Sequence, residues 1–150
     1  MGNFATGITV VTTKDKDGTF YGLTVNSFTS VSLEPVLVLV CLDNRLSGFQ
    51  ALTESKHFGV SMLSENQEDL SRIFAKKDSE RPASIYFEGK LGMPLLRNSI
   101  AVMECETIAT HLAGDHTIFV GQVEHADVFE AAKPLLYFRG KYQRISGTGK

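Results

Sequence analysis

The sequence has no long hydrophobic run and no marked excess of charge. Its longest uninterrupted apolar stretch, residues 36–42, has 7 residues, whereas a membrane-spanning helix needs about 20. The formal net charge at pH 7 is -2, which offers no basic surface to a nucleic acid. The N-terminus lacks a basic segment followed by an apolar one, so we expect no export signal and a cytoplasmic protein. These absences disfavour membrane, nucleic-acid-binding and secreted classes.

Cysteine is also scarce. The two cysteines, Cys41 and Cys105, both lie in apolar stretches, where a buried free thiol is the usual state. A disulfide would need their strands to adjoin, which sequence does not show. Neither has the spacing of a zinc ligand. His111 and His116 have no evident third ligand, so we expect no metal site.

Two common catalytic signatures are missing. The sequence has no Gly-x-Ser-x-Gly around a nucleophilic serine. It also has no Gly-x-Gly-x-x-Gly between a strand and a helix. The sequence therefore gives no support to a serine hydrolase or to a Rossmann-type nicotinamide site.

What is present is a series of β-rich segments with two helical ones. Apolar residues at spacings of three and four predict a helix over 66–77 and a shorter one near 46–52. Strands joined by short turns imply antiparallel pairing, so we predict a mainly β domain over 1–145 with two or three short helices. A tail, residues 146–150, follows and should be flexible. Strands are expected at 7–13, 19–28, 36–42, 57–63, 99–111, 117–128, 135–138 and 141–145. Gly89 and Gly92 predict a hairpin or a bulge within residues 85–93, which Pro94 interrupts.

The third of these segments is followed directly by polar residues. Residues 36–42 have the continuous apolar pattern of a strand buried on both faces. Asp43 and Asn44 then predict the N-cap of a helix. Free backbone N–H groups at such a helix start, with Arg45 and Ser47 in the first turn, suit a phosphate. A plain capped surface helix is the alternative.

Small polar side chains are concentrated in residues 22–35. If residues 22–28 are extended, successive side chains alternate between the two faces of the strand. Such a surface can bond a flat polar ligand lying across the strand. An ordinary edge strand running into a polar turn is the alternative. The hydroxyl and amide residues here are Thr24, Asn26, Ser27, Thr29, Ser30 and Ser32.

This stretch resembles the signature of the flavin reductase-like, FMN-binding split-barrel proteins, the short-chain flavin reductases of two-component monooxygenases. Four further segments resemble blocks of that family, in the family's order: residues 4–13, 38–43, 114–123 and 134–142. The resemblance covers residues 4–145. It implies an antiparallel split β-barrel of Greek-key type.

The resemblance also implies a set of site residues. The flavin would contact Thr24, Val25, Asn26, Ser27, Ser30, Val31 and Ser32. Its phosphate would lie near Cys41, Asp43, Arg45 and Ser47. Phe74 is also implied to approach the flavin, Arg81 to reach a phosphate and Tyr142 to line the pocket, although Arg81-Pro82 stands where the family commonly has Arg-Phe.

The block Gly114-Asp115-His116 would lie beside the flavin and bind nicotinamide, with His116 as the candidate catalytic residue. A structural turn with a solvated histidine is the alternative. The resemblance thus implies an NAD(P)H-dependent flavin reductase that passes hydride from NADH or NADPH to FMN or FAD, with reduced flavin going to a partner oxygenase. Relatives of this kind are usually homodimers.

Two other functions stay open at this point. One is a flavin-binding electron carrier or storage protein without NAD(P)H turnover, and residues 114–116 favour the reductase over it. The other is a fold relative that binds haem, which the lack of an evident axial ligand disfavours. The sequence does not distinguish FMN from FAD, NADH from NADPH, or a prosthetic flavin from a flavin used as substrate.

Overall fold

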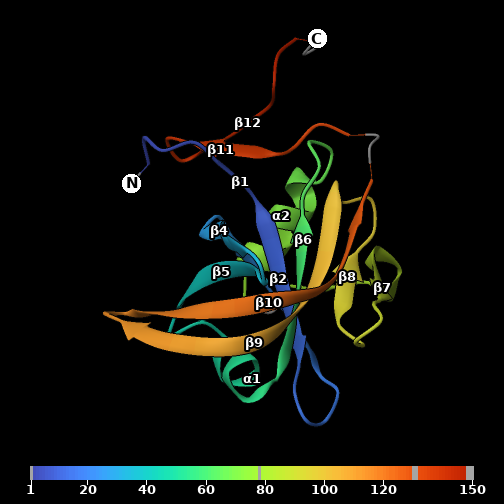
Figure 1. The fold of residues 1–150 in the computed structure, drawn as a ribbon. Coiled ribbons are helices and arrows are strands. Elements are labelled where there is room, and N and C mark those ends of the chain that lie inside the picture. The colour runs from blue at the N-terminus through green and yellow to red at the C-terminus, as the bar shows by residue number, and fades with distance from the viewer. Residues whose placement is uncertain (1, 78, 130–131, 148–150) are drawn as a thin grey trace.

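The computed structural model describes residues 2–77, 79–129 and 132–147. Its main element is a seven-stranded sheet in the order β3-β2-β6-β9-β10-β5-β4 (Figure 1). Every neighbouring pair in it is antiparallel, as the short turns predicted. Its strands are β2 (Thr9–Lys14), β3 (Phe20–Val25), β4 (Phe28–Leu33), β5 (Val36–Asp43), β6 (His57–Met62), β9 (Ala101–Ala113) and β10 (His116–Val128).

Two smaller sheets and the helices complete the described chain. β1 (Thr6–Gly7), β11 (Leu136–Phe138) and β12 (Lys141–Gln143) form one sheet, and β7 (Tyr86–Glu88) pairs with β8 (Pro94–Leu96) in the other. The helices are α1 (Phe49–Glu54), α2 (Glu68–Ala75) and a short 3-10 turn, η1 (Ala83–Ile85). In the part of the chain that the structure describes, no helix has the length and apolarity needed to span a bilayer.

The two edge strands of the large sheet are consecutive in sequence. Only Asn26 and Ser27 separate β3 from β4, so the sheet curls until its edges meet there. At this point Ser27 Oγ donates to Cys41 O at 2.6 Å, and Cys41 N donates to Ser27 O at 3.3 Å. Because the edges meet at this seam instead of pairing along their length, the sheet is a split β-barrel, as predicted.

The apolar residues pack in two clusters. The larger fills the barrel and includes Val40, Phe58 and Phe119, all 0% exposed. The smaller lies where β2 meets α2 and the C-terminal strands, and it includes Phe74 and Leu135. The amphipathic pattern of α2 is thereby explained.

β5 differs from its prediction, because only one of its faces is buried. Val38, Val40 and Leu42 point into the barrel, while Leu39 and Cys41 on the other face are half-buried. The continuous apolar run therefore marks a strand whose outer face is apolar without being covered. That outer face borders the candidate site.

β7 and β8 form a hairpin, one of the two alternatives predicted for residues 85–93, and Pro94 lies inside β8 opposite Glu88. The turn of this hairpin is held by Glu104, whose side chain is buried and whose Oε1 accepts from Leu91 N at 2.8 Å and Met93 N at 3.1 Å. Of the predicted tail, residues 146–147 lie outside the strands and helices. Residues 148–150 are outside the described part, so its flexibility stays a prediction.

Candidate functional site

Two hollows flank the connection between β3 and β4. The larger, here called the seam hollow, has a volume of about 860 Å³ and brings Asn26, Ser27 and Cys41 together with residues 4–9 and 134–136. The smaller, the side hollow, has a volume of about 200 Å³. Its lining includes the predicted residues Thr24, Val25, Asn26 and Tyr142. Six predicted residues therefore meet around this connection, and Asn26 lines both hollows.

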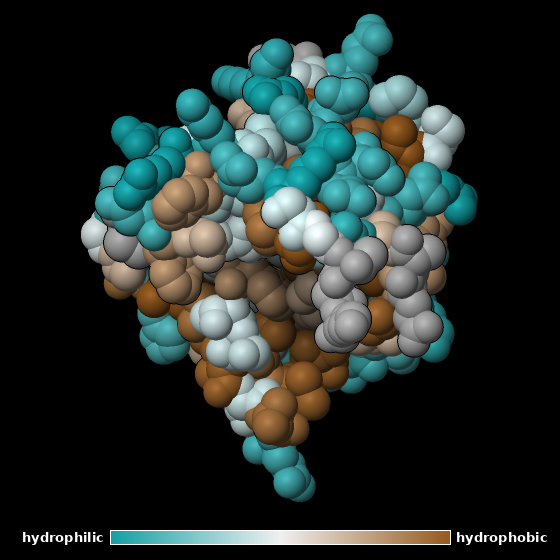
Figure 2. Space-filling view, turned by 90° about the horizontal axis from the view of Figure 1, so that it is seen from above, coloured by the Kyte–Doolittle hydropathy of each residue, from teal (hydrophilic) through white to brown (hydrophobic). Residues whose placement is uncertain are grey.

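The seam hollow has the mixed lining that a flat, partly polar ring needs. Phe28, Leu39 and Met62 supply apolar surface, and Asn26 and Ser27 supply polar groups. The view from the side of β1, β11 and β12 shows hydrophobic residues around a hollowed area at the centre of the face (Figure 2). The residues present thus fit a flavin ring, and the flavin contacts of the individual residues stay a prediction.

Three elements are tied together at the side hollow. Thr24 Oγ1 on β3 donates to Ser71 O on α2 at 2.7 Å, and the Ser71 hydroxyl bonds the Tyr142 hydroxyl on β12 at 2.9 Å. The Arg72 guanidinium lies 4.7 Å from the centre of the Tyr142 ring. Tyr142 therefore has a fixed position beside the polar strand.

Two predicted residues lie apart from the hollows. Phe74 is 2% exposed and belongs to the smaller core cluster, where its ring packs on Phe20 at 6.0 Å between centres. The Arg81 guanidinium lies 4.9 Å from the centre of the Phe74 ring. Neither residue is part of the lining of the seam or side hollow.

The remaining residues of the polar stretch lie along the open edge of β4. Residues 22–28 are not one strand, because the chain leaves the sheet at Asn26 and Ser27 and re-enters it on the opposite edge. A bulge between Ser30 and Ser32 leaves Val31 without a partner on β5. Ser30, Val31 and Ser32 are outside both hollows, and their flavin contact stays a prediction.

A second group of predicted residues gathers where β5 ends. Asp43 pairs with His116 in the register of β5 and β10. The Asp43 carboxylate accepts from Arg45 Nε at 3.0 Å and Nη2 at 2.7 Å. Asp115 Oδ1 lies 2.7 Å from His116 Nδ1. Hydrogen bonds from Arg45 lower the pKa of Asp43, and the hydrogen bond to His116 lowers the pKa of Asp115.

The prediction that a helix begins at Asp43 and Asn44 is wrong. Asn44 N donates to Asp115 O at 3.0 Å and Asn44 Oδ1 accepts from Thr117 Oγ1 at 2.8 Å, so these residues continue the contact with β10. The helix α1 starts at Phe49, after Gly48 with a φ of 95°. Because α1 has only 6 residues and starts beyond Ser47, the helix-dipole argument for a phosphate lapses. The phosphate contacts of Arg45 and Ser47 rest on the resemblance alone.

The two groups form one strip. Cys41 and Asp43 are two residues apart on the same face of β5, which places them about 7 Å apart along the strand. From the seam, the strip runs from Asn26 through Cys41 to Asp43 and His116. Gly114, with a φ of 68°, forms the turn that brings Asp115 and His116 to this end, because only glycine adopts that backbone conformation freely.

Sequence reasoning missed two residues that organise the site. Ser71 is 0% exposed on the apolar side of α2, and a hydroxyl on that stripe is a signal that a polar partner is buried with it. Asn44 was read as a helix cap, and no local signal distinguishes that role from its contact with Thr117. Both roles depend on strands distant in sequence.

Comparison with known proteins agrees with this geometry. The family model described as "Flavin reductase like domain" matches residues 1–146. An NADH-dependent flavin reductase of Rhodococcus sp is 37% identical over 153 residues, spanning 100% of this chain and 85% of that protein. The NADH-dependent flavin reductase StyB of Pseudomonas fluorescens is 40% identical over 141 residues, spanning 93% of this chain and 82% of that protein.

Solved structures show the same likeness. The NADH:FAD oxidoreductase SgcE6 of Streptomyces globisporus C-1027, in complex with NAD and FAD fragments, superposes with a TM-score of 0.93 and 36% identity. The match covers 99% of this chain and 90% of that one. The matched family model, the identity to these relatives and the shared fold show that this chain belongs to the flavin reductase-like family.

Proposed function

We propose that this chain is an NADH-dependent flavin reductase that binds flavin at the seam hollow and passes hydride to it from nicotinamide. The observation that carries the proposal is the strip from Asn26 to His116, which joins the predicted flavin residues to the predicted nicotinamide residues on one surface. Relatives of similar length are named NADH-dependent flavin reductases.

The chain's own residues have a limited task in such a reaction. Bound flavin supplies the hydride acceptor, and the protein orients the two ring systems and excludes water. Asn26 and Ser27 supply polar groups to one side of the seam hollow, and Phe28 and Leu39 supply an apolar wall. We expect His116, which bonds Asp115, to orient the nicotinamide nucleotide.

The charges at the end of β5 favour NADH over NADPH. The guanidinium of Arg45 is committed to Asp43 by two hydrogen bonds, and Asp115 adds a second carboxylate nearby. A phosphate on the ribose would meet these carboxylates, and like charges repel. We therefore expect NADPH to be the poorer donor.

An anaerobic absorbance assay tests this proposal. Purified protein with FMN or FAD is mixed with NADH and, separately, with NADPH. Bleaching of the visible flavin band with NADH establishes the reductase. Binding of flavin without bleaching by either nucleotide would instead identify an electron carrier or storage protein.

Transfer of the product to a second protein is part of the proposal. Relatives include the reductase subunit HsaB of a flavin-dependent monooxygenase in Rhodococcus jostii. We therefore expect that reduced flavin leaves this chain for an oxygenase. Tighter binding of reduced than of oxidised flavin would contradict release as the product step.

A homodimer is the assembly that the outer face of the sheet favours. The outward side chains of β5 and β10, including Leu37, Leu39, Ile118 and Val120, are half-buried and apolar. They adjoin the seam hollow, which Leu39 and Cys41 also line. A second copy seated on this face would bury apolar surface and enclose the flavin.

A further inference from the structure

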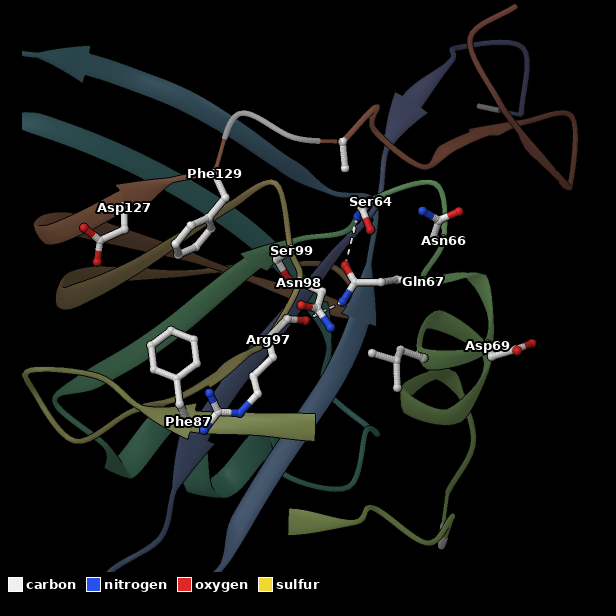
Figure 3. A pocket seen from close by; sticks show the side chains of 12 residues that line it. Ser64, Asn66, Gln67, Asp69, Phe87, Arg97, Asn98, Ser99, Asp127 and Phe129 are labelled. Atoms are coloured by element: carbon white, nitrogen blue, oxygen red, sulfur yellow. Dashed lines mark hydrogen bonds between the residues drawn. The ribbon is translucent and has the colours of Figure 1, made fainter. Parts of the chain in front are cut away.

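A large cavity lined by described residues lies away from the strip. Its volume is about 1020 Å³, and it has no lining residue in common with the seam or side hollow. It lies between the start of α2, the hairpin β7–β8 and the end of β10 (Figure 3). Its lining residues are Ser64, Asn66, Gln67, Asp69, Leu70, Phe87, Arg97, Asn98, Ser99, Asp127, Phe129 and Ala132.

One polar group in this lining has no partner within the described chain. Ser99 is 2% exposed, and its hydroxyl oxygen is buried without a hydrogen bond. Buried hydroxyls in folded proteins are nearly always bonded. Both ends of the Gln67 side-chain amide, by contrast, are hydrogen-bonded. Its Oε1 accepts from Ser64 N at 2.9 Å, and its Nε2 donates to Arg97 O at 2.8 Å. Ser99 therefore calls for a partner from outside the protein.

The rest of the lining indicates the chemistry of that partner. The rings of Phe87 and Phe129 both border the cavity (Figure 3), and Leu70 adds apolar surface. The exposed guanidinium of Arg97 lies 5.6 Å from the centre of the Phe87 ring. A planar apolar body with an anionic end matches aromatic walls beside an arginine.

Two carboxylates also line the cavity. Asp69 points away from the other labelled side chains, and Asp127 lies near Phe129 (Figure 3). An anionic ligand must therefore place its charge at Arg97 and away from Asp127. The hydroxyl of Ser99 can donate a second hydrogen bond to the same charged group.

We propose that this cavity is a second binding site, and that it takes a small aromatic carboxylate with its ring at Phe87 and Phe129 and its carboxylate at Arg97 and Ser99. The site is independent of flavin reduction. It can therefore be tested with neither flavin nor nicotinamide present.

Calorimetric titration of the purified protein with benzoate is the first experiment. We expect one site per chain and about tenfold weaker binding for both benzyl alcohol, which lacks the charge, and cyclohexanecarboxylate, which lacks the aromatic ring. The absence of benzoate binding overturns the proposal. Tighter binding of benzylamine than of benzoate also overturns it, because the charged end of the ligand would then be bound by Asp127 and not by Arg97.

Variants locate the ligand. Arg97→Gln should weaken benzoate at least about tenfold, because it removes a charge-assisted hydrogen bond. The matched control is Arg139→Gln, another exposed arginine whose guanidinium lies over a phenylalanine ring, at 5.1 Å from Phe138. Equal loss in the two variants would mean nonspecific binding and would overturn the proposal.

Ser99→Ala separates a ligand role from a structural one. Removing an unbonded hydroxyl should leave the melting temperature unchanged or raise it, while benzoate binding falls about fivefold. Unchanged affinity would overturn the role of Ser99. Displacement of benzoate by FMN would overturn the second site itself, because it would make the cavity part of the flavin cleft. The benzoate titrations and the anaerobic reductase assay test separate proposals, so the result of one does not decide the other.

Discussion

His116 is oriented by the 2.7 Å hydrogen bond between its Nδ1 and Asp115 Oδ1. Its neighbour across the sheet is Asp43, on the strand that lines the seam hollow. This position lets the ring contact a nucleotide that approaches from the end of β5. His116 is not among the residues that line the seam or side hollow.

Replacing His116 with alanine should therefore affect one ligand and spare the other. We expect the KM for NADH to rise about tenfold, the loss of one hydrogen bond to a bound ligand, with the Kd for flavin nearly unchanged. Steady-state kinetics and a flavin fluorescence titration measure the two. A parallel loss in both would remove His116 from the nicotinamide site.

Cys105 supplies a pH-dependent prediction at the same scale. Burial raises the pKa of its thiol to about 12, against about 8.5 in an unfolded chain. Above pH 8.5 the unfolded state releases this proton and the folded state keeps it. The free energy of unfolding should therefore be unaffected by this thiol at lower pH and fall by up to ~1.4 kcal/mol per pH unit above it.

The measurement is urea unfolding of the wild type and Cys105→Ala between pH 8 and 10.5. Both proteins share the titration of lysine and tyrosine, so the difference in slope isolates the thiol. The variant should lose stability less steeply as pH rises. Identical slopes would show that the folded thiol titrates normally. Cys41 and Cys105 are both free, and β10 lies between their strands, so no disulfide complicates the comparison.

At the scale of elements, the C-terminal hairpin is attached to α2 through Tyr142, which bonds Ser71 and lies beside the Arg72 guanidinium. The hydroxyls of Ser71 and Tyr142 are 2.9 Å apart, and Ser71 is 0% exposed. Tyr142→Phe leaves that buried hydroxyl without this partner. The expected loss of stability is about 1–2 kcal/mol, measured by urea unfolding.

The control for this variant is Tyr137→Phe. Tyr137 lies on the same hairpin and packs its ring on Tyr142 at 5.5 Å between centres. Tyr137→Phe should lower the free energy of unfolding less than Tyr142→Phe, because the ring contact between the two residues survives the change. If the double variant Ser71→Ala with Tyr142→Phe lost the sum of the two single losses, the two hydroxyls would not be coupled.

The whole molecule has an apolar outer sheet face, and this predicts its assembly. Ile118→Lys places a charge among Leu39, Cys41 and Val120, where a partner copy would bury it. Light scattering after gel filtration should show a dimer for the wild type and a monomer for the variant. Ser84→Lys, at an exposed position in η1, should stay dimeric. A monomeric wild type would contradict the dimer.

Element types were largely predictable from sequence, whereas strand partners and burial were not. The short turns gave the antiparallel pairing, and the 3–4 spacing gave α2. The apolar run in β5 gave a strand but not its exposed outer face, because burial depends on what packs from elsewhere. The break at Asn26 was missed for the same reason, since only closure of the barrel requires β3 and β4 to lie on opposite edges.

The sequence by itself determined the family and the set of candidate flavin-site residues, since both rest on ordered local blocks. Tertiary structure decided which of those residues meet. It bonded Ser27 to Cys41 beside the seam, set Asp43 opposite His116 on the neighbouring strand, and kept Phe74 in the core. It also formed the cavity at Ser99 from α2, β7 and β10, segments that are remote in sequence. The physical reason is that hydrogen bonding and burial act between neighbours in space, which a local pattern does not record.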